Sequence, residues 1–202
     1  MVVLGIDPGF GRVGYGIIDY ANNKYRVIEY GSITTPFNSD FSKRLLKIAE
    51  DLEDILERNK IDVVAIEELF FNTNVTTGIN VAQARGVMLY IFAKHNIEVY
   101  GYTPMQAKLA LCGYGKADKL QMKEMVKSFL KLQTMPKLDD TTDALALAIT
   151  HIHSNKFTFV KDSNKITKAK LDLQKQLELV KKQEKKDKEK FNKMVAKASK
   201  KK

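Results

Sequence analysis

The chain is poor in cysteine and histidine, the residues on which disulfide-bonded proteins and zinc sites depend. Its 202 residues include one cysteine, three histidines and no tryptophan. A single cysteine, Cys112, excludes an intramolecular disulfide framework and is typical of a reducing compartment such as the cytoplasm. The same scarcity argues against a zinc site built on thiolates. We therefore expect a cytoplasmic protein whose chemistry depends on other side chains.

Long apolar runs are missing as well. No stretch approaches the roughly 18 consecutive apolar residues that a membrane helix needs, so we expect no membrane contact. The first seven residues have the pattern of a strand rather than of a charged and then apolar leader, so we expect no signal peptide. The hydrophobic content of 44% is ordinary for a globular protein. This length accommodates one α/β domain with a real core.

Negative charge is scarce in one part of the chain. Residues 162–202 hold 15 lysines but only 6 acidic residues, whereas residues 1–161 are close to neutral. A basic tail is typical of an electrostatic arm for nucleic acids, and the alternative is a merely solvated appendage. We predict that residues 158–202 form a basic extension, flexible or partly helical, and that residues 1–157 form the folded domain.

The periodicity of the apolar residues predicts an α/β fold over residues 1–157. The first three predicted strands, separated by turn signals at Pro8-Gly9 and 21–23, favour an antiparallel three-stranded start. The later alternation of helix and strand favours a mixed central sheet with helices on both faces. The predicted strands are 1–7, 12–20, 25–35, 61–67 and 97–102, and the predicted helices are 41–59, 75–95, 104–111, 117–131 and 140–154.

Carboxylates stand at the ends of two predicted strands and at the start of the last predicted helix. They are Asp7, the pair Glu67 and Glu68, and the group Asp139, Asp140 and Asp143. The Cβ atoms of Asp140 and Asp143 are expected about 5–6 Å apart on one helix face, with Asp139 as the N-cap. Carboxylates held together raise one another's pKa unless a cation compensates them. Because Mg²⁺ prefers such oxygens, the pattern predicts a metal-dependent phosphoryl-transfer enzyme.

Simpler interpretations exist for each acid. Asp7 is followed by a glycine-rich turn, where aspartates often bond their own backbone. Acids also favour helix N-termini, by about 0.3–1 kcal/mol each. However, residues 144–149 are apolar on nearly every face of the last helix, so its acids lie at the edge of a core. The glycines between positions 5 and 16 permit close backbone approach or phosphate cradling, and the residues alone leave Glu67 and Glu68 undecided.

Several separated motifs resemble, in order, the RuvC family of Holliday-junction resolvases, which are crossover junction endodeoxyribonucleases. They are Ile6-Asp7-Pro8-Gly9 with Gly14-Tyr15-Gly16, Ala65-Ile66-Glu67 with Phe70, Gln83-Ala84-Arg85-Gly86, and the run from Asp143 to His151. The resemblance covers about residues 1–155. It implies an RNase H-like fold, a homodimer on a four-way DNA junction, paired symmetric nicks with ligatable ends, and a branch-migration motor as a partner.

The resemblance also implies roles for individual residues. The family's acids fall on Asp7, Glu67, Asp140 and Asp143, which would bind two Mg²⁺ or Mn²⁺ ions for two-metal-ion hydrolysis. Phe70 matches an aromatic residue near the junction bases, with Phe71 as its neighbour. Lys108 and Lys119 match basic positions near the scissile phosphate, and Lys116 adds a further charge to the same region. Arg85 lies in a helix that contributes to dimer or DNA contacts in the family.

Three rival functions remain at this stage. The opening strand with its Asp and Gly also occurs in the actin-like and sugar-kinase ATPases, although about 155 residues are too few for their two domains. A nuclease for other branched or replication-fork DNA is a nearer alternative. A non-enzymatic junction-binding protein, with its acids as surface caps, would bind DNA and cut none.

Overall fold

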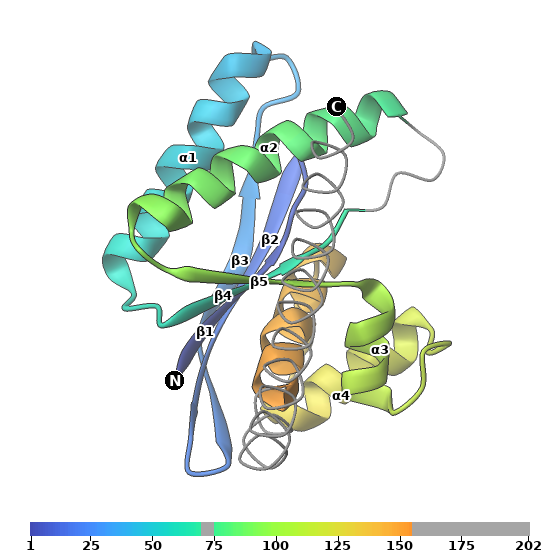
Figure 1. Ribbon diagram of the computed structural model, residues 1–202. Helices are drawn as coiled ribbons and strands as arrows, with labels where there is room; N and C mark the ends of the chain where they lie inside the picture. Colours follow the sequence, from blue (N-terminus) through green and yellow to red (C-terminus); the bar gives the residue numbers. More distant parts are fainter. Residues whose placement is uncertain (70–74, 155–202) are drawn as a thin grey trace, which may run out of the picture. The chain divides into compact units, whose positions relative to one another are not determined.

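The computed structural model describes residues 1–69 and 75–154 (Figure 1). The chain divides into two compact units, Met1–Asn155 and Lys156–Lys202, and the fold described below is that of the first unit. The predicted extension 158–202 and the predicted DNA-contacting residue Phe70 lie outside the described residues.

The predicted antiparallel start of the sheet is confirmed. Strands β1 (Val2–Asp7), β2 (Arg12–Ala21) and β3 (Lys24–Thr34) pair antiparallel in sequence order. A two-residue turn joins β2 to β3, with φ values of 51° at Asn22 and 57° at Asn23. Positive φ at both positions matches the right-handed twist of a hairpin, and asparagine tolerates it better than most residues.

Two parallel strands complete a five-stranded mixed sheet, as predicted. Strand β4 (Val63–Glu67) pairs parallel with β1, and β5 (Glu98–Tyr102) pairs parallel with β4. The strand order is β3-β2-β1-β4-β5. Because β1 and β4 run in the same direction, their last residues, Asp7 and Glu67, lie at the same edge of the sheet.

Helices cover both faces of the sheet, which confirms the predicted layering (Figure 1). Alternate residues of each strand point to opposite faces. Val3 and Ala65 face the core under α3 (Pro104–Cys112), α4 (Lys119–Leu130) and a further helix at 139–154. Leu4 and Ile66 face the core under α1 (Phe41–Arg58) and α2 (Val75–Lys94). By the same alternation, Asp7 and Glu67 belong to the face that the 139–154 helix covers.

Glycines allow the 139–154 helix to lie directly against the sheet. A Cβ atom at Gly5 would lie 1.9 Å from the backbone oxygen of Ala144, and one at Gly14 would lie 2.0 Å from that of Asp140. No real Cβ atom approaches that closely, so both positions require glycine. Of the two roles considered for these residues, the structure shows close approach to the helix. This approach brings the start of the helix to the end of β1.

The far end of the same helix is fixed by its two histidines. His151 is 1% exposed, and its Nδ1 lies 2.8 Å from the Tyr102 hydroxyl at the end of β5. The Nε2 of His153 lies 2.7 Å from the Tyr25 hydroxyl, and its Nδ1 lies 2.9 Å from the carbonyl oxygen of Ala110. Because a carbonyl only accepts, Nδ1 donates there and Nε2 accepts from Tyr25.

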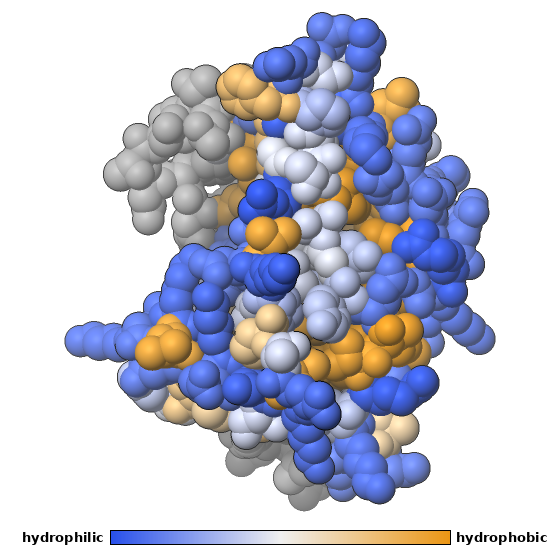
Figure 2. Space-filling model, turned by 180° about the vertical axis from the view of Figure 1, so that it is seen from behind, coloured by the Kyte–Doolittle hydropathy of each residue, from blue (hydrophilic) through white to orange (hydrophobic). Residues whose placement is uncertain are grey.

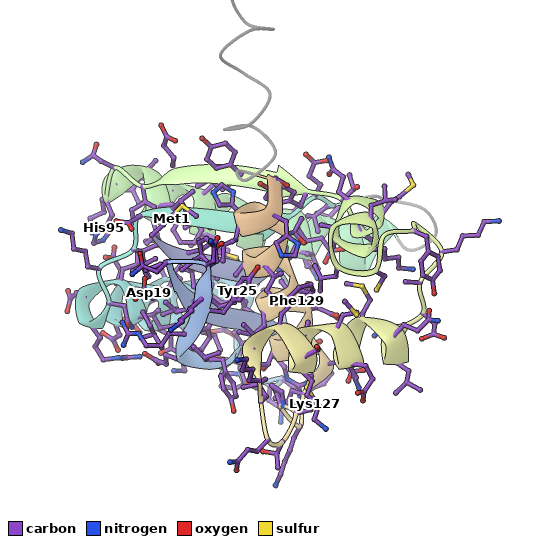
Figure 3. The ribbon with its side chains drawn as sticks, turned by 90° about the horizontal axis from the view of Figure 1, so that it is seen from below. Met1, Asp19, Tyr25, His95, Lys127 and Phe129 are labelled. Carbon is purple, nitrogen blue, oxygen red and sulfur yellow. The ribbon has the colours of Figure 1, made fainter. Side chains whose placement is uncertain are left out.

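An aromatic contact closes this end of the core. Tyr25 of β3 and Phe129 of α4 lie next to each other (Figure 3), with their ring centroids 5.9 Å apart. The His153 ring packs edge-on against Phe129 at 4.9 Å. The 139–154 helix therefore contacts β3, α3 and α4 through His153, and these contacts fix its orientation.

One face of the molecule is mostly hydrophilic. On the side opposite to that of Figure 1, hydrophobic residues form separate patches among hydrophilic ones (Figure 2). In the described part of the chain, every helix is too short or too polar to cross a membrane.

Candidate active site

Two carboxyl groups meet where β1 and β4 end. Ile6 pairs with Ile66 in the parallel register, so Asp7 and Glu67 are the next residues along adjacent strands. Burial, followed by the charge of Glu67 and a side-chain hydrogen bond with Glu67, raises the pKa of Asp7 from 3.8 to about 8. Burial and the neighbouring carboxylates therefore favour the protonated form of Asp7 when no cation is present.

The 139–154 helix adds two more carboxylates. The charges of Asp143 and Asp140 both contribute to the raised pKa of Asp7. The pKa of Asp143 is itself raised by burial, against the lowering effect of Lys119, and Glu67 raises it further. The structure thus brings together the four predicted acids from β1, β4 and one helix.

Neighbouring acids have other partners. Glu68 is exposed and lies beside Gly101, where a Cβ atom would meet its Oε1 at 2.8 Å, so only Glu67 faces Asp7. The prediction that Asp139 is the N-cap was wrong, because the helix already begins at residue 139. The Asp139 carboxylate lies 2.7 Å from Lys123 Nζ and 3.6 Å from Lys119 Nζ. Asp139 therefore neutralises lysines of α4.

A cavity of about 270 Å³ opens beside the acids. Glu67 and Asp143 line it together with Lys108 of α3 and Lys119, the first residue of α4. The cavity is otherwise lined by apolar residues and a proline, namely Pro104, Ala107, Met122, Ala146 and Leu147. Lys116 is exposed in the loop between α3 and α4 and is not among the lining residues.

Both lysines are held by well-capped helices. Thr103 and Gln106 form a capping box at the start of α3, and Pro104 occupies its first turn. Asp118 and Gln121 form the equivalent box at the start of α4. Consequently α4 begins at Lys119, two residues later than predicted, and this places the Lys119 side chain beside the acids.

The donor set fits a hard divalent cation. Four carboxylates in a partly buried site repel one another, and this repulsion adds to burial, the larger cause, in raising the pKa of Asp7. Oxygen ligands of this kind suit Mg²⁺ or Mn²⁺. Within residues 1–69 and 75–154, no three acidic, histidine or cysteine side chains already converge as ligands of one ion. Asp140 pairs with Arg12, at 3.3 Å between Oδ2 and Nη1.

Residues 3–151 match the family model of the crossover junction endodeoxyribonuclease RuvC. The chain belongs to the RuvC family. It is 53% identical over 156 residues to the RuvC of Clostridioides difficile (strain 630), covering 77% of this chain and 92% of that relative. It is 51% identical over 158 residues to the RuvC of Alkaliphilus oremlandii (strain OhILAs), covering 78% and 96%. This membership sets aside the ATPase interpretation of the opening strand.

Solved structures agree with this assignment. Thermus thermophilus RuvC in complex with a Holliday junction substrate is 33% identical, with a TM-score of 0.74 over 78% of this chain and 96% of that one. The yeast mitochondrial Holliday junction resolvase Ydc2 is 13% identical, with a TM-score of 0.57 over 75% and 77%, and is similar in fold alone. The predicted RNase H-like fold of the RuvC family is confirmed.

Two arginines at the RuvC site escaped the sequence analysis or were left without a role. Arg12 starts β2 and pairs with Asp140. Arg85 of α2 donates from Nε to the backbone oxygen of Glu67, at 3.3 Å, and so supports the end of β4. One sequence signal could have identified Arg12. It comes directly after the turn that follows Asp7, so it starts β2 at the edge of the sheet where Asp7 ends β1.

Proposed function

We propose that this RuvC-family chain is a metal-dependent endodeoxyribonuclease that resolves Holliday junctions by paired symmetric nicks in DNA recombination and repair. The observation that supports the proposal is a group of four carboxylates beside a cavity, which two of them, Glu67 and Asp143, line together with Lys108 and Lys119. Carboxylates alone would repel a phosphodiester. A cation between them reverses that repulsion, and the two lysines add positive charge to the lining of the cavity.

The acids Asp7, Glu67, Asp140 and Asp143 would hold two divalent ions, Mg²⁺ or Mn²⁺. When bound, such ions supply activation of the attacking water and stabilisation of charge on the departing 3′-oxygen. The chain's own contribution is to fix the four carboxylates on packed elements. Lys108 and Lys119 place their ammonium groups against the phosphate oxygens, where they offset the charge that develops during cleavage.

Further DNA contacts follow from the family resemblance. Lys116 is exposed between α3 and α4, and we propose that it meets a phosphate outside the cavity. Phe70 comes three residues after the end of β4, and we propose that it stacks on opened bases at the crossover, which is worth about 1–3 kcal/mol per base. The tail at 158–202 would act as a basic arm along the DNA backbone.

Paired nicks require two active sites, so the proposal includes a homodimer. One face of α2 supports it. Ile79 is 51% exposed, Tyr90 is 67% exposed, and a Cβ atom at Gly86 would meet nothing within 4 Å. With Gln83, also exposed, these residues recur at helical spacing along one side of α2. Gly86→Glu is expected to turn a dimer into a monomer in sedimentation experiments, whereas a dimer that survives the change would exclude this face.

Two features of the setting complete the proposal. We propose a cytoplasmic location, because the chain has one cysteine and belongs to a DNA-processing family. We also propose a branch-migration motor as a partner, on the family resemblance.

The test is cleavage of a four-way junction, a replication fork and a linear duplex, with Mg²⁺, Mn²⁺ or EDTA. Glu67→Gln and Glu68→Gln form a matched pair, because each removes one charge at the end of β4. We expect junction cleavage only with a divalent cation, loss of it in Glu67→Gln, and parental cleavage in Glu68→Gln. Preferred cutting of the fork would indicate a nuclease for other branched DNA. Binding without cutting under all conditions would indicate a non-enzymatic junction-binding protein.

A further inference from the structure

We propose that Phe10, Arg12, Phe37, Phe41 and Arg44 form a second DNA-contact surface, which holds the strand next to the scissile phosphate. This arginine–aromatic surface rests on the proposed function, because it presumes that DNA is cut at the four carboxylates. It adds a contact region outside the cavity that Lys108 and Lys119 line.

The strand topology places this surface at the same sheet edge as the acids. Arg12, at the start of β2, pairs with Thr34, at the end of β3. The loop at 8–11 and the loop at 35–40 therefore leave the sheet at the edge where Asp7 ends β1. In the strand order, β3 and β2 lie on one side of β1, while β4 and β5 lie on the other. The surface thus lies on the opposite side of Asp7 from α3, which follows β5.

Hydrogen bonds join the two loops into one unit. The Thr35 amide donates to the backbone oxygen of Gly11 at 3.1 Å, and the Thr35 hydroxyl donates to that of Phe10 at 2.8 Å. The same hydroxyl accepts from Arg44 Nε at 2.9 Å, and Thr35 itself is buried. The backbones of these loops and the Arg44 side chain are therefore held in place before any ligand arrives.

The aromatic residues have the exposure of a stacking platform. Phe37 is 89% exposed at the tip of a turn that Ser39 closes with a hydrogen bond to the oxygen of Pro36, at 3.2 Å. A phenylalanine stabilises a fold when it is buried, and Phe37 is not buried. Phe41 is 37% exposed and stacks on Phe10 at 4.8 Å. Exposed rings beside cations are typical of surfaces that bind unpaired bases.

The arginines supply charge that suits phosphates. The Arg44 guanidinium lies 3.8 Å from the centre of the Phe10 ring and donates only to uncharged oxygens, those of Thr35 and Phe10. Among the described residues, no carboxylate lies within ion-pair distance of Arg44. Arg12 pairs with Asp140, and a cation bound at Asp140 would weaken that pair and leave the Arg12 charge for a phosphate. This continuity with the acids favours DNA over a protein partner.

The first test is binding of a labelled four-way junction in EDTA, where metal-dependent cleavage is prevented. Phe37→Ala is expected to raise the Kd about 5- to 100-fold without changing the salt dependence, because it removes stacking and no charge. Phe37→Tyr, which keeps the ring, should bind like the parent. Because Phe37 is so exposed, neither change disturbs the fold. Parental Kd in Phe37→Ala would overturn its place in the surface.

The second test is the salt dependence of the same equilibrium. Arg44→Gln should reduce the slope of log K against log salt by about 0.9, the value for one lost phosphate contact. Lys24→Gln removes an equal charge at the hairpin end of the sheet, away from the acids, and should leave the slope unchanged. Equal slopes in the parent and Arg44→Gln would overturn the proposal. If the unsubstituted protein does not bind a junction, the proposed function itself is wrong. If it binds but the variants behave like it, only the arginine–aromatic surface is wrong.

Discussion

Replacing Asp7 by asparagine is expected to stabilise the metal-free protein while abolishing its response to metal. In the folded state the pKa of Asp7 is about 8, against an ordinary value of 3.8. Between these pH values the folded chain holds a proton that the unfolded chain has released, so stability falls as pH rises from about 4 to 8. Asparagine has no charge to bury, and Asp7→Asn should lack this loss.

The size of the effect follows from the pKa. One pKa unit corresponds to 1.36 kcal/mol, so the full difference amounts to about 6 kcal/mol above pH 8. Water and solvent cations reach the partly exposed site and screen the charges. We therefore expect Asp7→Asn to raise the free energy of unfolding by about 2–4 kcal/mol at pH 9 in EDTA. At pH 4, where Asp7 is neutral in the parent as well, the two proteins should be nearly equal.

Urea unfolding at pH 4 and pH 9, each with EDTA, measures this difference. Adding Mg²⁺ at about 100 times its Kd should stabilise the parent by about 2.7 kcal/mol and Asp7→Asn far less. If the difference in unfolding free energy between Asp7→Asn and the parent is the same at pH 4 and pH 9, the raised pKa of Asp7 does not affect stability. A variant that is less stable than the parent at pH 9 would also contradict the prediction.

Three further predictions concern the 139–154 helix. Gly14→Ala should lower the free energy of unfolding by about 3 kcal/mol, because its Cβ would lie 2.0 Å from the Asp140 backbone oxygen. Gly11→Ala is the control and should lower it by under about 0.5 kcal/mol, because its Cβ would meet only Arg44 Nη2 at 3.6 Å. Burial lowers the pKa of His151, so the parent should lose stability relative to His151→Gln as pH falls below 6.5 in denaturant titrations. Thr142→Val should gain about 1 kcal/mol in the same assay, because in the described part of the chain the buried Thr142 hydroxyl has no hydrogen-bond partner.

Local sequence signals predicted most of the fold. The paired asparagines at 22 and 23 indicated the hairpin, and the apolar periods placed each described strand and helix to within about two residues. The errors in the predicted fold concern the first residues of two helices. The helix that carries Asp140 begins at residue 139, and α4 begins at Lys119, because capping geometry rather than periodicity decides where a helix starts.

The acids of the site were predictable in type but less so in arrangement. Alternation along β4 distinguishes Glu67 from Glu68 only once the face that the 139–154 helix covers is known. The pairing of Arg12 with Asp140 joins residues 128 positions apart, and no local pattern predicts such a contact. The glycines of β1 and β2 were compatible with close backbone approach or with phosphate cradling. Only the packing of the 139–154 helix against them shows that they permit close approach.

Cleavage mapping on a mobile four-way junction tests whether the four carboxylates form the catalytic centre of a junction-resolving nuclease. The junction is labelled in each strand, and the parent and Asp143→Asn are compared with Mg²⁺ at equal fractions of bound DNA. We expect nicks at symmetry-related positions in two opposing strands, sealed by DNA ligase, and a rate at least about 100-fold lower in Asp143→Asn. Cleavage by Asp143→Asn at the parental rate and positions would contradict this expectation.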